Sequence, residues 1–310
     1  MDRKTIIRIA QLYYNEDLTQ QEIADLMGLS RITISTLLKK AREMGIIQIH
    51  VIPDEVETVE ELEKALAGRF GLKQAVVVQC PPGPEDQIKK HIGMAGARFL
   101  ERTLKDGDTL ACSWGRTLWE TASFIKPGNL RINVVQLNGG LGQISDKSLP
   151  TELAKHLAHV FGGSYYYLHA PGIVGNPGIK DALLSDSAIQ GTISRAKAAT
   201  VAACGIGSII NSALVEFGCI SAGQLDQLRA LGVVGDICLR FFGRDGRLRR
   251  SELDERIIGL SAEDLRAIPC VVGIAGGPSK HEALQGALRS GLLNAVVTDA
   301  ESARAVLNTE

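Results

Sequence analysis

One short stretch combines cationic, hydroxyl and apolar side chains at a spacing that suits contact with DNA. A helix over residues 31–44 would place six of them on its outer side, at about 100° per residue: Ile32, Thr36 and Lys39, flanked by Thr33, Ser35 and Lys40. Lysine neutralises phosphates, hydroxyls bond to base edges or phosphates, and an outward isoleucine suits a thymine methyl. We therefore predict a helix that reads the major groove.

Helix caps and a glycine turn position this helix. Thr19 and Glu22 fit a capping box, Gly28 tolerates the left-handed conformation of a C-cap, and Ser30 fits an N-cap. This order predicts a helix-turn-helix whose second helix is the reader. The predicted DNA contacts are Thr19, Gln20, Gln21, Ser30, Arg31, Ile32, Thr33, Ser35, Thr36, Lys39 and Lys40. The alternative is an ordinary helical hairpin with a solvated polar face.

A second group of residues suits an anionic small molecule. A predicted strand ends at Ser113, and a glycine, a hydroxyl and an arginine follow it before a predicted helix: Trp114, Gly115, Arg116 and Thr117. Backbone N–H groups and the helix dipole favour a phosphate there. Ligands of open α/β sheets bind beyond the carboxyl ends of strands, where glycine-bearing loops recur: Asn138, Gly139 and Gly140; Gly205 and Gly207; Gly276 to Lys280.

A single carboxylate, Asp236, interrupts an apolar run. Buried without a partner it would cost several kcal/mol, so it needs a ligand hydroxyl or a cation such as Lys280. We expect a small polyol phosphate, with Arg116 and the 115–117 amides on phosphate and with Asp236 and Lys280 on hydroxyls or a carbonyl. His169 and Asp236 are the general-base candidates of an alternative sugar-phosphate isomerase or deaminase, but no acid/base pair of suitable spacing emerges, so we expect no enzyme.

Composition places these groups in a globular chain of two domains. The 310 residues are 45% hydrophobic and 22% charged, with a net charge of −1. The sequence lacks an apolar run of about 18 residues, which a membrane helix requires, and its charged N-terminus argues against a signal peptide. We expect a cytoplasmic protein without membrane contact, whose six scattered cysteines are buried free thiols rather than zinc ligands.

Alternating strands and helices from Leu72 onward predict a mostly parallel, Rossmann-like sheet with helices on both faces. The predicted strands cover 75–78, 109–113, 133–137, 165–168, 200–204, 233–242, 270–275 and 295–298, and Gly243–Gly246 suggests a hairpin turn. The domains are 1–53, which binds DNA, and 54–310, which binds the effector and oligomerises. A strand at 46–51 would make the first domain winged. A helix over 55–70 carries an apolar stripe, for which we slightly favour self-association over packing in its own domain: Val56, Val59, Leu62 and Leu66.

The chain resembles the SorC family of bacterial sugar-responsive transcription regulators along essentially its whole length. The resemblance is carried by IAQLYYNEDLTQQEIADLMGLSRITISTLLKKAREMGII, FGLKQAVVV, SWGRTL, ACGIGS, VGDICLRFF and GIAGGPSK. It implies an effector domain similar to the sugar-phosphate isomerase and deaminase fold, a phosphorylated sugar as ligand, operator DNA as partner, and a dimer or tetramer. By motif, the pocket would include Ser113 to Thr117, Gly139, Gly140, Gly205 to Gly207, Asp236 and Lys280. No cofactor or metal is implied. Trp114 is expected near the sugar and Trp119 in the core.

Overall fold

Two units make up the computed structural model, Met1–Val56 and Glu57–Glu310. The structure describes residues 3–16, 18–47, 58–128, 130–141, 149–210 and 212–309. Each unit has its own hydrophobic core. None of the helices in these ranges has the length and apolar character needed to cross a lipid bilayer.

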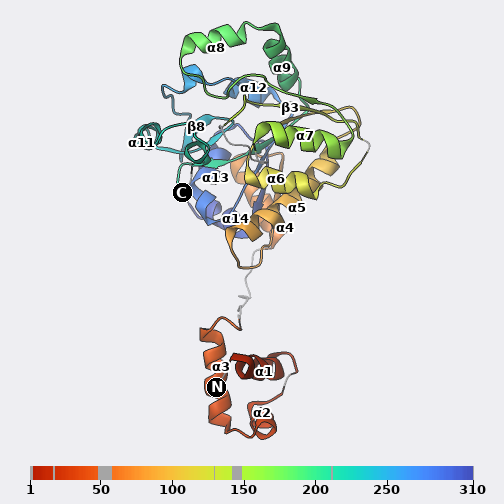
Figure 1. The fold of residues 1–310 in the computed structure, drawn as a ribbon, viewed down its shortest axis with the longest axis vertical. Helices are drawn as coiled ribbons and strands as arrows, with labels where there is room; N and C mark the ends of the chain where they lie inside the picture. Colours follow the sequence, from red (N-terminus) through yellow and green to blue (C-terminus); the bar gives the residue numbers. More distant parts are fainter. Residues whose placement is uncertain are drawn as a thin grey trace. The chain divides into compact units, whose positions relative to one another are not determined.

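The N-terminal unit is built from three helices, α1 (Arg3–Tyr14), α2 (Gln20–Met27) and α3 (Arg31–Glu43) (Figure 1). Thr19 and Glu22 form the predicted capping box, Gly28 ends α2 with φ 64°, and Ser30 caps α3. The predicted helix-turn-helix is thus confirmed. Its buried core comprises Ile6, Ile9, Ala10, Leu12, Ile23, Ala24, Ile34, Leu37, Leu38 and Ala41.

The predicted wing falls mostly outside the described residues. Ile46 and Ile47 follow α3 without forming a strand and pack against the core of the unit. The rest of the predicted strand, residues 48–51, and the predicted domain boundary at 53/54 lie outside the described residues.

The second unit is organised by a parallel sheet, as its alternating pattern predicts. Within the described residues, seven strands pair in the order β1-β10-β9-β5-β2-β3-β4, all parallel. These strands are β1 (Gln74–Val78), β2 (Thr109–Cys112), β3 (Asn133–Gln136), β4 (Tyr165–Tyr166), β5 (Val201–Gly205), β9 (Cys270–Ile274) and β10 (Ala295–Asp299). Because all run the same way, their carboxyl ends share one edge of the sheet.

Helices cover both faces of this sheet. The core of one face includes residues of α5, α6 and α7, and the core of the other includes residues of α4, α12, α13 and α14 (Figure 1). The helices of this unit are α4 (Val59–Phe70), α5 (Glu85–Thr103), α6 (Arg116–Phe124), α7 (Pro150–Phe161), α8 (Pro177–Leu184), α9 (Ser187–Lys197), α10 (Ala213–Glu216), α11 (Ala222–Ala230), α12 (Ala262–Ala267), α13 (His281–Arg289) and α14 (Ala300–Leu307).

The stripe of α4 is buried inside its own unit. Leu62 and Leu66 are fully buried in the core that α4 shares with α13 and α14, and Val59 packs against that core. The preference for self-association through this stripe is therefore corrected, since its leucines have no free surface to offer a second copy. Val56 lies outside the described residues.

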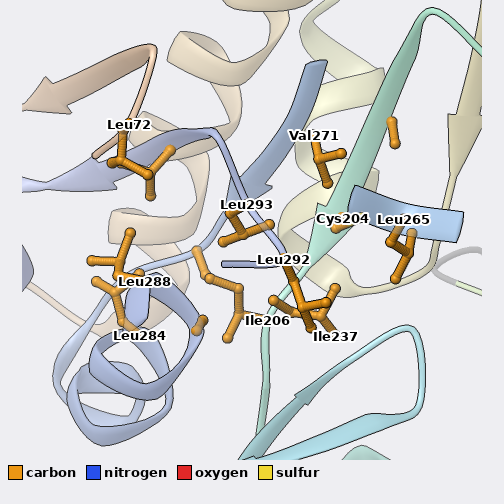
Figure 2. Packing of buried hydrophobic residues seen from close by; sticks show 14 of the residues in the cluster. Leu72, Cys204, Ile206, Ile237, Leu265, Val271, Leu284, Leu288, Leu292 and Leu293 are labelled. Atoms are coloured by element: carbon orange, nitrogen blue, oxygen red, sulfur yellow. The ribbon is translucent and has the colours of Figure 1, made fainter. Parts of the chain in front are cut away.

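A smaller antiparallel sheet departs from the sequence-based expectation. The run 233–242, expected as one strand, is a hairpin of β7 (Val233–Ile237) and β8 (Arg240–Gly243), to which β6 (Gly207–Ser208) adds in the described chain. The chain reverses at Cys238 and Leu239, whose φ values are 53° and 64°. Ile237 belongs to the main hydrophobic core, and Figure 2 shows it among the labelled residues of that cluster.

Candidate functional site

A cavity of about 170 Å³ opens at the carboxyl ends of β2, β5 and β9. Nine of the twelve predicted effector residues line it: Ser113, Trp114, Gly115, Arg116, Thr117, Gly205, Gly207, Asp236 and Lys280. Ser279, from the predicted strand-end loop 276–280, also lines the cavity, and the structure adds Glu85, Lys89 and Phe217. Glu85 and Lys89 lie at the start of α5, which follows β1. The rule that ligands bind beyond the carboxyl ends of strands could therefore have predicted these two residues.

The N-terminus of α6 faces the cavity without a side-chain cap. Gly115 precedes the helix with φ 136°, and a Cβ there would meet no atom within 4 Å. Arg116 and Thr117 then begin the helix in the cavity lining. Helix N–H groups without a capping side chain, together with the helix dipole, favour an anion. Arg116 and Lys89 add cationic side chains to the same cavity.

Lys280 and Asp236 bring opposite charges into the cavity. Lys280 donates from Nζ to the Ile206 carbonyl at 2.8 Å, and Asp236 accepts from the Leu239 N–H at 3.1 Å. Burial raises the pKa of the Asp236 carboxyl, while the Leu239 bond and the charge of Lys280 act to lower it. Burial lowers the pKa of the Lys280 ammonium, and Asp236 opposes that change. Both side chains keep bonding capacity for a polar ligand.

Two glycines let the backbone approach these groups. A Cβ on Gly207 would lie 1.9 Å from Oδ1 of Asp236, and one on Gly205 would lie 2.6 Å from the Trp114 carbonyl oxygen. Ser113 is buried and accepts from the Gly205 N–H at 2.9 Å through its Oγ. The loop after β5 therefore packs closely against the loop after β2 and against Asp236.

Three predicted effector residues lie outside the cavity lining. Asn138 pairs with Gly259 in a β-bridge, the Gly139 N–H donates to Ile258, and the Gly140 N–H donates to Ala170. A Cβ on Gly139 would come within 2.4 Å of the Ala170 carbonyl oxygen. The close packing of this loop against other backbone segments explains why it contains glycines. The prediction that these three residues line the cavity is therefore corrected.

The two tryptophans lie in different surroundings. Trp114 lines the cavity and contacts Phe217 edge-on, with ring centroids 6.1 Å apart. Trp119 packs against a core cluster and contacts the His156 ring. His169 is exposed beside Tyr167 and is not among the cavity residues.

A buried carboxyl with a raised pKa predicts a pH-dependent effect of Asp236→Asn. The folded state holds the Asp236 proton more tightly than the unfolded state, so ionisation destabilises the wild type as pH rises through about 4. At pH 7 the free energy of unfolding should therefore be higher for the variant than for the wild type, and the difference should shrink as the pH falls below about 4. Urea unfolding at both pH values measures it. An equal difference in the free energy of unfolding at the two pH values would contradict the raised pKa of Asp236.

The outer side of α3 is open to solvent. Ile32 is 79% exposed, and the other exposed side chains of the predicted reader are Ser30, Arg31, Ser35, Thr36, Lys39 and Lys40. Some hydroxyls have local partners: Thr33 contacts the Ser30 hydroxyl, and Thr36 donates to the Ile32 carbonyl. On α2, Gln21 is exposed and bonds Asp25, while Gln20 is half-buried and Thr19 serves as the cap.

Known proteins share both parts of this architecture. Residues 54–308 match the family described as "Putative sugar-binding domain", and residues 8–43 match "Sigma-70, region 4". The chain is 33% identical to the Deoxyribonucleoside regulator of Bacillus subtilis (strain 168), over 97% of this chain and 96% of the relative. It is 32% identical to the Sorbitol operon regulator of Klebsiella pneumoniae, over 99% of this chain and 98% of the relative. The crystal structure of full-length SorC from Klebsiella pneumoniae superposes with a TM-score of 0.75 at 31% identity, covering 98% of this chain and 99% of that one.

The chain belongs to the SorC family of sugar-binding transcriptional regulators. It is accordingly a DNA-binding regulator with a sugar-binding domain. In this SorC-family regulator, α3 is the second helix of the helix-turn-helix and the cavity lies within the sugar-binding domain.

Lys39→Ala tests whether α3 contacts DNA phosphates. The exposed Lys39 ammonium would neutralise one phosphate, so its removal should weaken binding to all duplexes and reduce the slope of log K against log salt by about one. Fluorescence anisotropy at several salt concentrations measures this slope. An unchanged slope would refute the contact, and Lys126→Ala, in the other unit, serves as control.

Ile32→Ala tests direct reading of a base by the most exposed apolar side chain of α3. Loss of contact with a thymine methyl should cost about 1–3 kcal/mol at one A·T position of the operator. Binding to operators that vary one base pair at a time measures the effect. Equal loss on every sequence would count against base readout.

Proposed function

We propose that this regulator binds a phosphorylated sugar in the cavity, without turnover, and that occupancy alters its affinity for operator DNA. The observation that carries the proposal is the convergence of an uncapped helix N-terminus with three cations, Arg116, Lys89 and Lys280, around one cavity. Phosphate suits the α6 amides and Arg116. Asp236 and Lys280 suit the hydroxyls or carbonyl of the sugar, because they can accept and donate beside it.

The coupling to DNA requires more than one reader helix. We propose a homodimer or homotetramer in which α3 helices occupy half-sites about 34–36 Å apart, one turn of DNA, or a multiple of that spacing. An effector that binds one arrangement of copies more tightly would shift the population toward it and change the spacing. This arrangement explains how a cavity in one unit controls a helix in the other.

A thermal-shift screen tests the ligand assignment. The panel contains glucose 6-phosphate, fructose 6-phosphate, ribose 5-phosphate and sorbitol 6-phosphate, each beside its unphosphorylated parent. A ligand at a hundredfold excess over Kd stabilises the native state by about 2.7 kcal/mol. We expect a shift with a phosphorylated compound that is lost in Arg116→Ala. A shift with a free sugar alone would replace the phosphate subsite by a hydroxyl subsite, and no shift with any compound would refute the ligand class.

A further inference from the structure

A carboxylate already contacts the arginine that we assign to the ligand's phosphate. Arg116, at the start of α6, forms an ion pair with Glu216, the last residue of α10. The two residues are 100 positions apart in sequence, and their side chains are 54% and 52% exposed. The pair therefore lies at the solvent side of the cavity, where a ligand from solution can compete for it.

A second contact fixes the segment that carries Glu216. Phe217 follows α10, is buried, and meets the Trp114 ring edge-on. Ala213 and Phe217 line the cavity, although Glu216 itself does not. The segment 213–217 thus contacts the β2–α6 loop twice, through an aromatic pair and an ion pair. Phe217 holds the backbone of this segment while the Glu216 carboxylate reaches Arg116.

The other acidic side chains near the cations have different partners. Glu85 accepts a hydrogen bond from Ser279 Oγ at 2.7 Å and lies 3.9 Å from Lys89. Asp86 pairs with Lys89 at 3.0 Å. Asp236 is buried and accepts from the Leu239 N–H. Glu216 is therefore the carboxylate positioned to occupy Arg116.

We propose that Glu216 competes with the phosphate of the ligand for Arg116, and so sets the affinity of the cavity for anions. This inference rests on the proposed function. Carboxylate and phosphate both accept from the in-plane N–H donors of a guanidinium, so the two anions compete for the donors of Arg116 or share them. A phosphate dianion beside Glu216 is also repelled by it. Glu216 therefore weakens binding of every phosphorylated ligand and leaves neutral sugars unaffected.

The consequence is selectivity as well as affinity. A ligand retains strong binding only when its sugar contacts Asp236 and Lys280 offset the displacement of Glu216. Inorganic phosphate and unrelated phosphorylated metabolites lack those contacts and bind weakly. Glu216 thus reduces false responses to abundant phosphate compounds, and it is a specificity-determining residue of the cavity.

Glu216→Gln isolates this role, with inorganic phosphate as the probe. The amide keeps the shape of the side chain and removes its charge. We expect phosphate to bind the variant about threefold to tenfold more tightly than the wild type, since exposed ion pairs and nearby like charges have effects of this size. Titration calorimetry at constant ionic strength, with chloride as the balancing anion, measures Kd. The matched control is Asp106→Asn, which removes another exposed carboxylate paired with an arginine, Arg131, before the start of β2.

The outcomes separate this inference from the proposed function. Tighter phosphate binding in Glu216→Gln, lost again in the double variant with Arg116→Ala and absent in Asp106→Asn, supports it. If the wild type binds phosphate through Arg116 and Glu216→Gln binds no more tightly, the competition is overturned while the phosphate subsite stands. If Arg116→Ala binds phosphate as well as the wild type does, or neither wild type nor Glu216→Gln binds it, both are overturned.

Discussion

Gly207→Ala is expected to weaken the response to effector strongly while the protein stays folded. The added methyl would lie 1.9 Å from Oδ1 of Asp236, so the carboxylate or strand β6 must move. Overpacking of this kind costs about 1–3 kcal/mol. If it displaces Asp236 from the ligand, affinity falls about tenfold to a hundredfold, because each 1.4 kcal/mol is a factor of ten. Calorimetric titration with the sugar phosphate that stabilises the wild type measures the loss.

Gly191→Ala is the matched control for that substitution. Gly191 lies in α9 with no atom within 4 Å of an added Cβ, so alanine should leave effector binding unchanged and favour the helix slightly. Unchanged effector affinity in Gly207→Ala would contradict the placement of Asp236 at the ligand.

Leu38→Ala is expected to unfold the N-terminal unit and to remove DNA binding. Leu38 is 2% exposed and packs between the helices of a small core. Truncation of a buried leucine costs about 2–5 kcal/mol, and a unit of this size has a small stability margin. Hydrogen exchange of residues 3–47 should become fast, whereas the sugar-binding unit should keep its protection, because it has separate cores.

Leu26→Ala is the control, since its side chain is 65% exposed on α2. It should leave exchange in α1 and α3 slow. If Leu38→Ala also keeps slow exchange there, the stability of the unit does not depend on this core.

The capping residues made the helix-turn-helix predictable because their effects are local. The Thr19 and Glu22 bonds and the left-handed Gly28 depend on neighbours within a few residues. The hairpin at 233–242 was not predictable by the same means. Its turn uses Cys238 and Leu239 at positive φ, residue types that rarely adopt that conformation, so an apolar run looked like one long strand.

The cavity was predictable where a general rule of topology applies. Parallel strands bring their carboxyl ends to one edge, which gathered Ser113 to Thr117, Gly205 and Lys280. Asn138, Gly139 and Gly140 also follow a strand. Their backbone, however, bonds to distant segments of the chain and packs there instead of lining the cavity: Ala170, Ile258 and Gly259. The pairing of Arg116 with Glu216 spans 100 residues. It depends on where α10 packs, which no local pattern encodes.

The most direct test of the account is operator binding with and without effector in three proteins: wild type, Lys280→Ala and Arg69→Ala. The operator is a duplex selected in vitro from random sequences by the wild type, and the effector is the compound that stabilises the protein in the thermal screen. Arg69 bonds the carbonyls of Leu307 and Thr309, away from the cavity lining, and serves as control.

We predict that all three bind the operator alike without effector. The effector should change the Kd of wild type and Arg69→Ala about tenfold, a typical allosteric coupling, and leave that of Lys280→Ala unchanged. A Lys280→Ala protein that responds to effector as the wild type does would contradict the claim that ligand binding in the cavity controls the affinity for operator DNA.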